Sequence, residues 1–266
     1  MELQEYVDAW EQSLRSLLDL LPSLADDDWS RPTELPGWSV HDLVAHLASV
    51  ERELLGDPHP APPAAYGPHV LTDFGRHMED GVDVRRAVPG DALAAELAEA
   101  LELRLPVVRA ARADAPPVRV VAGEDWDMAE LLRNRAFDAW MHEQDLRRAV
   151  TRPGNLDGPG ALVTWELVGH ALPFLVARRA KASAGASVRL DSTGPLVRTM
   201  SVVVDESGRG RPVAGPLDAP VTTLSADWET WVRLLGGRQS PNDAVVEMSG
   251  DTALARRLVD RFCVTP

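Results

Sequence analysis

The chain has 266 residues, 45% of them hydrophobic, which is enough for one large or two small domains with a real core. Its 41 acidic and 27 basic residues give a formal net charge of −14, and no basic cluster is large enough to bind nucleic acid. No apolar run approaches the roughly 18 residues of a membrane span. The acidic, amphipathic start MELQEYVDAWEQ is not a signal peptide, so we expect a soluble, cytoplasmic protein.

The single cysteine, Cys263, limits the sulfur chemistry that the chain can perform. It excludes an intrachain disulfide and a zinc site built from cysteines. It lies in the apolar run LVDRFCV, which favours a buried small hydrophobic residue over a nucleophile. Any thiol chemistry would therefore need a thiol from outside the protein.

Helical patterns run through about the first 180 residues. Apolar residues recur every three or four positions over 2–22, the rhythm of a helix with one buried face. The proline-rich stretch 57–69 cannot be helical and predicts a loop. Further helices are expected over 71–87, over 91–113 with a kink at Pro106, over 127–150, and over 159–182 with a bend at Pro173.

The second helix, expected over 39–55, has a well-marked start. Ser39 and Asp42 have the spacing of a capping box, and Trp38 and Leu43 have that of a hydrophobic staple. We therefore expect Trp38 to pack against the end of this helix, as a structural residue.

Strand patterns replace the helical ones after Gly185. Four segments alternate or run apolar at strand length: SVRLDST, RTMSVVVDE, PVTTLSA and AVVEMSG. Short helices are expected over 227–235 and 251–262. The predicted fold is an up-down helical bundle over 1–183, followed by a small α+β domain over 184–266.

The two histidines of the helix over 39–55 fall on different faces. At 100° per residue, His46 flanks the apolar stripe and His41 lies roughly opposite it. The stripe consists of Val40, Leu43, Leu47, Val50 and Leu54. We therefore expect His41 in solvent and His46 facing the bundle or its rim.

The helix over 127–150 carries Asp138 and His142, four residues apart on one face. That face also carries Met128, Leu131 and Leu146, so it should point inward. An ionised carboxylate on an inward face is costly unless it is paired or bound to a metal. A divalent cation would satisfy both side chains at once.

Two helices thus offer three potential metal ligands, His46, Asp138 and His142. Helical bundles build metal sites from facing helices in this way. Three protein ligands leave an open position, as in catalytic zinc sites, and the same set suits non-haem Fe(II).

Two neighbouring charges leave alternatives open. In a metal-free arrangement, Arg135 would neutralise Asp138 from one turn away, beside an Asp–His hydrogen bond. Asp145, one turn beyond His142, would either orient that histidine or form a surface salt bridge with Arg148.

Two segments carry a family resemblance. WSRPTELPGWSVHDLVAHLASVE (29–51) and RAFDAWMHEQDLRRA (135–149) resemble the signatures of the mycothiol-dependent maleylpyruvate isomerase family, in the DinB/YfiT-like metalloenzyme superfamily. The C-terminal part, from LSADWETWVRLLGGRQS to VVEMSGDTALARRLVDRF, is similar to the family's small α+β domain. The resemblance covers nearly the whole chain and implies a DinB-like bundle followed by that domain.

The resemblance also implies a metal site and a reaction. The family's ligand positions fall on His46, Asp138 and His142, with a glutamate more usual where this chain has Asp138. It implies a divalent metal, with Zn²⁺ as the expected ion, and mycothiol as the thiol cosubstrate. The metal-bound thiolate would add to an electrophilic unsaturated acid. Rotation and elimination then give the trans isomer, whereas related transferases keep the adduct.

A small, carboxylate-bearing substrate would favour an arginine in the site. Arg238 matches an arginine that recurs in similar sequences, and Arg76 is a weaker candidate; either could also be a surface charge. We expect a monomer or homodimer. Two other functions stay open: a metalloenzyme of the same fold that uses metal-bound water or thiol-independent biosynthetic chemistry, and a non-catalytic binding module.

Overall fold

In the computed structural model, which describes residues 1–120 and 125–265, capping boxes begin both helices that carry the predicted ligands. The Asp42 amide donates to Ser39 Oγ at the start of α3 (Val40–Leu54), and Ser39 N donates to Asp42 Oδ2. Asp127 and Glu130 exchange the same pair of hydrogen bonds at the start of α6 (Met128–Ala149). The predicted capping box of the second helix is therefore confirmed.

The chain divides into two compact units, Met1–Val163 and Thr164–Thr265. The division falls inside a helix, α7 (Pro159–Phe174), whereas the sequence patterns place the boundary between 183 and 184. The sequence pattern therefore assigns to the bundle a helix of which most residues belong to the second unit.

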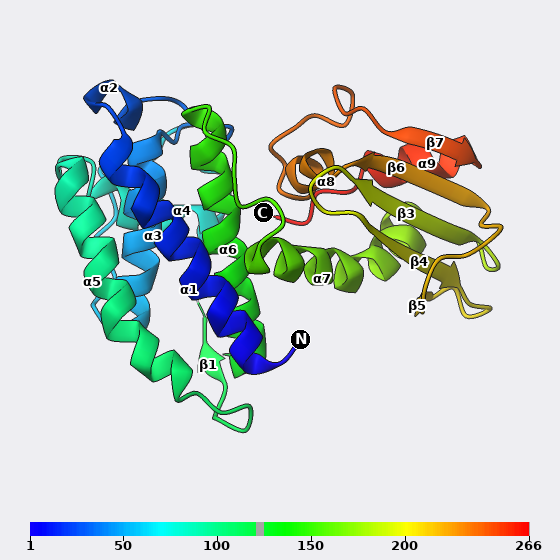
Figure 1. Cartoon of the computed structure of the whole chain (residues 1–266), viewed down its shortest axis with the longest axis horizontal. Coiled ribbons are helices and arrows are strands. Elements are labelled where there is room, and N and C mark those ends of the chain that lie inside the picture. The colour runs from blue at the N-terminus through cyan, green and yellow to red at the C-terminus, as the bar shows by residue number, and fades with distance from the viewer. Residues whose placement is uncertain (121–124, 266) are drawn as a thin grey trace. The chain divides into compact units, whose positions relative to one another are not determined.

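The first unit is a helical bundle, as predicted (Figure 1). Besides α3 and α6, its helices are α1 (Leu3–Leu20), α2 (Asp26–Trp29), α4 (Asp73–Asp83) and α5 (Gly90–Arg109). Helix α1 packs against α5 and α6, and α3 packs against α4, α5 and α6. The strands β1 (Val118–Arg119) and β2 (Asp125–Trp126) form an antiparallel pair that no sequence pattern predicted.

The bundle core includes most of the apolar residues predicted to face inward on α1 and α3, together with residues of α5. Large side chains that are 0 or 1% exposed fill it: Trp10, Leu14 and Leu17 from α1, Leu43 and Leu47 from α3, and Leu97 and Leu101 from α5. Because both ligand-bearing helices share this core, their facing side chains are held in fixed positions.

Several helix ends differ from the predicted ones. Helix α4 begins after Thr72, whose Oγ1 accepts a hydrogen bond from Gly75 N at 2.9 Å. Helix α5 continues through Pro106 and ends at Arg109 rather than 113. A 3₁₀ turn, Leu21–Ser23, follows α1.

The second unit is a small α+β domain, as predicted. Its strands are β3 (Ser187–Thr193), β4 (Arg198–Val204), β5 (Gly210–Val213), β6 (Thr222–Asp227) and β7 (Glu247–Gly250). They form one mixed sheet in the order β5-β4-β3-β6-β7, in which β3 and β6 are parallel and the other neighbours antiparallel. The helices α8 (Trp228–Leu235) and α9 (Thr252–Val259) match the two predicted short helices, although α9 ends before 262.

The strand β5 is absent from the sequence prediction. It contains Pro212, which pairs with Val202 of β4 at the edge of the sheet. Proline has no amide proton to donate, so it is tolerated only at such an edge. The short segment lacks apolar alternation, which is why the pattern missed it.

Helix α7 corrects the expectation that no apolar segment approaches the length of a membrane span. With the π-helical segment Leu175–Arg179 that follows Pro173, it forms a helix, Pro159–Arg179, that is long and apolar enough to cross a membrane. Half of its most apolar window is buried inside the protein. Core helices of soluble proteins pass the same test of length and composition, so the helix is weak evidence for a membrane span.

Two single-residue expectations are wrong. Cys263 is only half-buried, because α9 ends at Val259 and the cysteine lies beyond it. His41 is not a solvent histidine: it is half-buried, and its Nε2 lies 2.8 Å from the Val88 carbonyl oxygen. The segment between α4 and α5 covers that face of α3, which a helical wheel of α3 alone does not show.

Candidate metal centre

His46 of α3 meets Asp138 and His142 of α6. His46 Nε2 lies 3.4 Å from Asp138 Oδ2, and His142 Nε2 lies 3.4 Å from Asp138 Oδ1. One potential ligand atom from each residue lies within 4.8 Å of the other two. The side chains of the two histidines are 4% and 8% exposed and that of Asp138 is 28% exposed, so the trio is open to solvent at the carboxylate.

The nitrogens of His46 test whether these residues fit a metal. Neither Nδ1 nor Nε2 makes a hydrogen bond with any residue that the structure describes, although both are buried. Buried polar atoms in proteins nearly always have a partner. Burial lowers the pKa of His46 and outweighs the opposing charge of Asp138, which favours the neutral imidazole with its lone pair. A divalent cation bound at Nε2 would supply the missing partner.

Arg135 holds the carboxylate of the trio. Its Nη1 donates to Asp138 Oδ2 at 2.8 Å, and its Nη2 donates to Glu51 Oε1 at 2.8 Å. Burial acts to raise the pKa of Asp138, but Arg135 and the two imidazoles outweigh it and hold that pKa well below its usual range. The ion pair between Arg135 and Asp138 that a metal-free site requires is therefore present, and His46 still makes no hydrogen bond with a described residue.

Glu51, which is not among the predicted site residues, anchors this arginine. The carboxylate is fully buried and also accepts hydrogen bonds from Trp10 Nε1 at 2.9 Å and from Arg104 Nη1. At 100° per residue, Glu51 flanks the apolar stripe of α3 on the side opposite His46. That inward-facing charge was the signal that could have identified it.

Asp145 makes both of the contacts that the sequence left open. Its Oδ2 lies 3.2 Å from His142 Nδ1, and its Oδ1 accepts from Arg148 Nη2 at 2.6 Å. The carboxylate is fully buried, so the pair with Arg148 is not a surface salt bridge. Burial lowers the pKa of His142, but Asp138 and Asp145 outweigh it and raise that pKa overall. With Nδ1 facing Asp145, Nε2 faces Asp138.

Trp38 forms one wall of the trio. Its ring centroid lies 5.0 Å from that of His46 and 6.1 Å from that of His142. Its Nε1 donates to Glu79 Oε2 at 2.9 Å, which fixes the indole. Trp38 packs against the bundle core as expected, and this contact with both histidines is one that the sequence did not indicate.

The two arginines predicted to bind substrate lie in different units. Arg76 of α4 is half-exposed, pairs with Asp73, and lies 6.0 Å from the centroid of the Tyr66 ring. Arg238 of the second unit donates to the Gly236 carbonyl oxygen. A substrate-binding role for either arginine stays a prediction.

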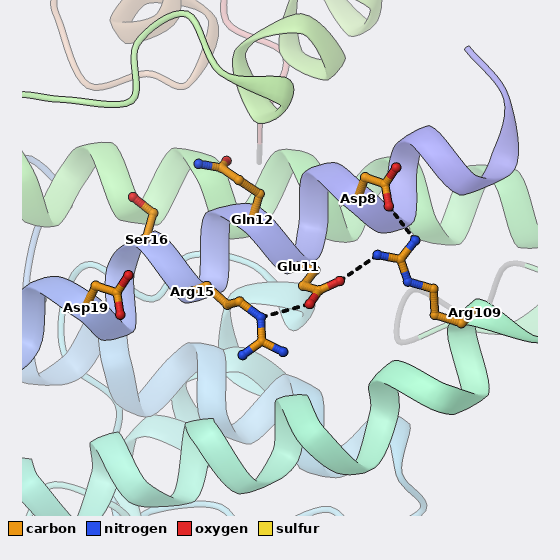
Figure 2. Close-up of a pocket in the computed structure, with 7 residues that line it drawn as sticks. All are labelled: Asp8, Glu11, Gln12, Arg15, Ser16, Asp19 and Arg109. Atoms are coloured by element: carbon orange, nitrogen blue, oxygen red, sulfur yellow. Dashed lines mark hydrogen bonds and ion pairs between the residues drawn. The ribbon is translucent and has the colours of Figure 1, made fainter.

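An open hollow of about 430 Å³ lies along α1 and at the end of α5 (Figure 2). It is lined by Asp8, Glu11, Gln12, Arg15, Ser16, Asp19 and Arg109. Figure 2 shows Arg15 and Arg109 turned toward Glu11. Arg15 Nε lies 2.8 Å from Glu11 Oε1, and Arg109 Nη2 lies 2.6 Å from Glu11 Oε2. Because Arg15 and Arg109 pair with the carboxylates of Glu11 and Asp8 and the trio takes no part in the lining, we place the candidate site at the trio.

Two family models match the chain. The model "Mycothiol maleylpyruvate isomerase N-terminal domain" matches residues 10–147, and "MDMPI C-terminal domain" matches residues 163–257. The chain belongs to the mycothiol maleylpyruvate isomerase family. The predicted resemblance is therefore confirmed, and all three residues of the trio lie within the first matched range.

Solved structures of the mycothiol-dependent maleylpyruvate isomerase share the fold of this family member. One has a TM-score of 0.56 and 20% identity, and a histidine-to-alanine mutant has a TM-score of 0.58 and 19% identity. Each match covers 94% of this chain and 93% of the other. At that identity the likeness shows the fold alone. A search of curated proteins found no match.

Proposed function

We propose that the protein is a metal-dependent enzyme that activates mycothiol. It would isomerise an electrophilic unsaturated small molecule or transfer the thiol to it. The observation that carries the proposal is that the two buried nitrogens of His46, beside Asp138 and His142, make no hydrogen bond with a described residue. Membership of the family supports mycothiol as the thiol and a small molecule as the substrate.

Zinc is the ion that we propose for the trio. Two imidazoles and one carboxylate are ligands that zinc prefers, and three protein ligands leave the open position of a catalytic site. When bound there, zinc would hold the sulfur of mycothiol as a thiolate, the form that attacks electrophiles. We propose that the thiol is that of mycothiol, which comes from outside the chain, and not that of the half-buried Cys263.

The surrounding residues would prepare the ligands. Asp145 orients His142 through Nδ1, so that Nε2 stays available for the metal. Arg135 occupies Asp138 Oδ2 and leaves Oδ1, on the side of His142, as the available oxygen. Trp38 covers both imidazoles and keeps water from that side of the trio.

Asp138 is one methylene shorter than the glutamate that is usual in the family. We propose that the clamp by Arg135, itself fixed by Glu51, sets the position of the shorter carboxylate. The substrate would carry a carboxylate of its own, with Arg76 and Arg238 as the candidates to bind it. A cytoplasmic monomer or homodimer is the assembly that we expect.

The test is an assay of purified, zinc-loaded protein with maleylpyruvate, with and without mycothiol. We expect thiol-dependent conversion to the trans isomer, or a thiol adduct detected by mass spectrometry, and loss of both in Asp138→Ala and His142→Ala. Conversion at the same rate without thiol would favour chemistry by metal-bound water. A protein that binds no metal and shows no turnover would favour a binding module.

A further inference from the structure

A second cluster of potential metal ligands lies where the proline-rich loop meets α3 and α4. Glu53 is near the end of α3, His59 is in the loop, and His77 is on α4. His77 Nε2 lies 2.8 Å from Glu53 Oε2 and 3.0 Å from Oε1. His59 Nδ1 lies 3.4 Å from Glu53 Oε2. One ligand atom from each of the three residues lies within 4.8 Å of the others.

The outer contacts of His59 show why a cation fits between these groups. Its Nε2 lies 3.1 Å from Asp80 Oδ2, and Tyr66 donates its hydroxyl proton to Asp80 Oδ1 at 2.8 Å. When His59 donates to Asp80 through Nε2, its unprotonated Nδ1 faces the Glu53 carboxylate, so two acceptors oppose each other. A cation between them removes that repulsion. Asp145 holds His142 of the trio in the same way.

The two imidazoles lie face to face beside the Glu53 carboxylate. The rings of His59 and His77 stack with centroids 3.6 Å apart and an interplanar angle of 17°. Both present a nitrogen to the same carboxylate of Glu53. The three side chains are 23 to 31% exposed, which gives an ion a path from solvent.

This cluster is separate from the trio. Glu53 follows His46 by seven residues, so it lies on the same face of α3 about 10 Å further along the axis. The two ions of a bridged two-metal site lie about 4 Å apart. An ion at Glu53 therefore cannot share ligands or chemistry with an ion at His46.

We propose that Glu53, His59 and His77 bind a second divalent cation of the zinc class, with Asp80 orienting His59. Two imidazoles and a carboxylate are a ligand set for zinc rather than for magnesium or calcium, which prefer oxygen ligands. The three residues come from two helices and the loop between them, so the ion fastens the loop to both helices.

The far end of the same loop reaches the wall of the trio. A Cβ at Gly37 would lie 2.3 Å from His69 Nδ1, so the loop packs directly on the turn before Trp38. His69 Nε2 lies 3.4 Å from Glu79, the carboxylate that accepts from Trp38. An ion bound at His59 thus restrains a loop whose other end packs beside the candidate catalytic site.

Zinc binding to the untagged, metal-stripped full chain tests the proposal, with zinc alone as the probe. Calorimetric titration should give two bound zinc ions per chain for the wild type. It should give one for Asp138→Ala, which removes a ligand of the trio. In the Asp138→Ala background, adding Glu53→Gln or His59→Ala should weaken the remaining site at least about 100-fold, and Asp80→Asn about 10- to 100-fold. Circular dichroism verifies that each variant is folded.

Matched controls are Glu99→Gln and His170→Ala, whose side chains are 65% and 57% exposed and belong to neither cluster. They should leave both equivalents intact. A single wild-type equivalent that Asp138→Ala abolishes would overturn the second site and leave the trio standing. A single bound zinc ion that Glu53→Gln abolishes would support the second site and count against the trio. The experiment therefore separates failure of the second site from failure of the trio.

The fastening of the loop has its own readout. Chymotrypsin cleaves after aromatic residues, and Tyr66 is the aromatic residue of the loop. In the Asp138→Ala background, saturating zinc should slow cleavage at Tyr66 several-fold, and it should have no effect once His59→Ala is added. Equal cleavage rates with and without zinc in the Asp138→Ala protein would refute the restraint.

Discussion

Arg135 Nη1 lies 2.8 Å from Asp138 Oδ2, so the carboxylate of the candidate metal centre is neutralised without any metal. An inward-facing aspartate is therefore not in itself evidence for a cation in this protein. What points to a cation is His46, whose two buried nitrogens lack hydrogen-bond partners among the described residues. A metal ion and an arginine can bind the same carboxylate, because the carboxylate has about four lone-pair positions.

Zinc should stabilise the protein through His46. At a free zinc concentration 100 times the dissociation constant of the trio, binding contributes about 2.7 kcal/mol to the stability of the bundle. His46→Ala should remove that contribution, seen as a smaller zinc-induced rise in the unfolding midpoint by differential scanning calorimetry. His170→Ala, at an exposed histidine outside the trio, is the control. An undiminished zinc response in His46→Ala would exclude this histidine as a ligand.

Asp145→Asn should weaken zinc binding at the trio about 10- to 100-fold, the usual cost of losing a carboxylate that orients a ligand histidine. Competition with a chromophoric chelator measures the affinity in a Glu53→Gln background, which isolates the trio. Arg148→Gln is the matched control, because it removes the other partner of Asp145 without touching His142. If both variants lose affinity equally, the effect comes from the buried ion pair and not from the orientation of His142.

Local periodicity explains how much of the site the sequence could predict. Asp138 and His142 are four residues apart on one helix, and His46 lies beside an apolar stripe, so both features follow from helix geometry. The partners of Glu51 and Trp38 could not be predicted in this way, because they come from other helices.

The fold shows the same division between local and tertiary information. Capping signals placed the start of α3, and apolar alternation placed β3 over the residues that form it. The edge strand β5 depends on its pairing with β4, which no local pattern indicates. The burial of His41 depends on the segment around Val88 that packs over it, which no local pattern indicates either.

Gly250→Ala should destabilise the second unit more than Gly208→Ala does. Both glycines have positive φ, at +77° and +75°, so both substitutions incur about 1–2 kcal/mol of backbone strain. At Gly250 the new Cβ would also lie 2.1 Å from the Val221 carbonyl oxygen, which accepts a hydrogen bond from the Asp251 amide. At Gly208 the new Cβ would meet nothing within 4 Å. Urea unfolding should therefore show an additional loss of about 1–3 kcal/mol for Gly250→Ala. Equal losses would mean that the end of β7 can shift.

Glu51→Gln should be among the most destabilising isosteric substitutions in the bundle. It removes the buried charge that pairs with Arg104 and Arg135, and breaking a buried ion pair costs about 3–5 kcal/mol. Glu99→Gln, on the exposed side of α5, should change stability by less than about 0.5 kcal/mol. Urea unfolding of both variants at pH 7 measures the difference. A loss of under 1 kcal/mol for Glu51→Gln would show that the arginines find other partners.

The destabilisation by Glu51→Gln should also depend on pH. Burial acts to raise the pKa of Glu51, but Arg104 and Arg135 outweigh it and the folded-state pKa is lowered. A carboxyl whose pKa is lower in the folded state stabilises the protein fully above its unfolded pKa of about 4.3, and the contribution is lost as the pH falls toward the folded value. The stability gap between wild type and Glu51→Gln should thus be constant from pH 8 to about pH 5.5 and shrink below about pH 4. A gap that widens on acidification would require Glu51 to be protonated in the folded protein at neutral pH, and the two arginines beside it argue against that.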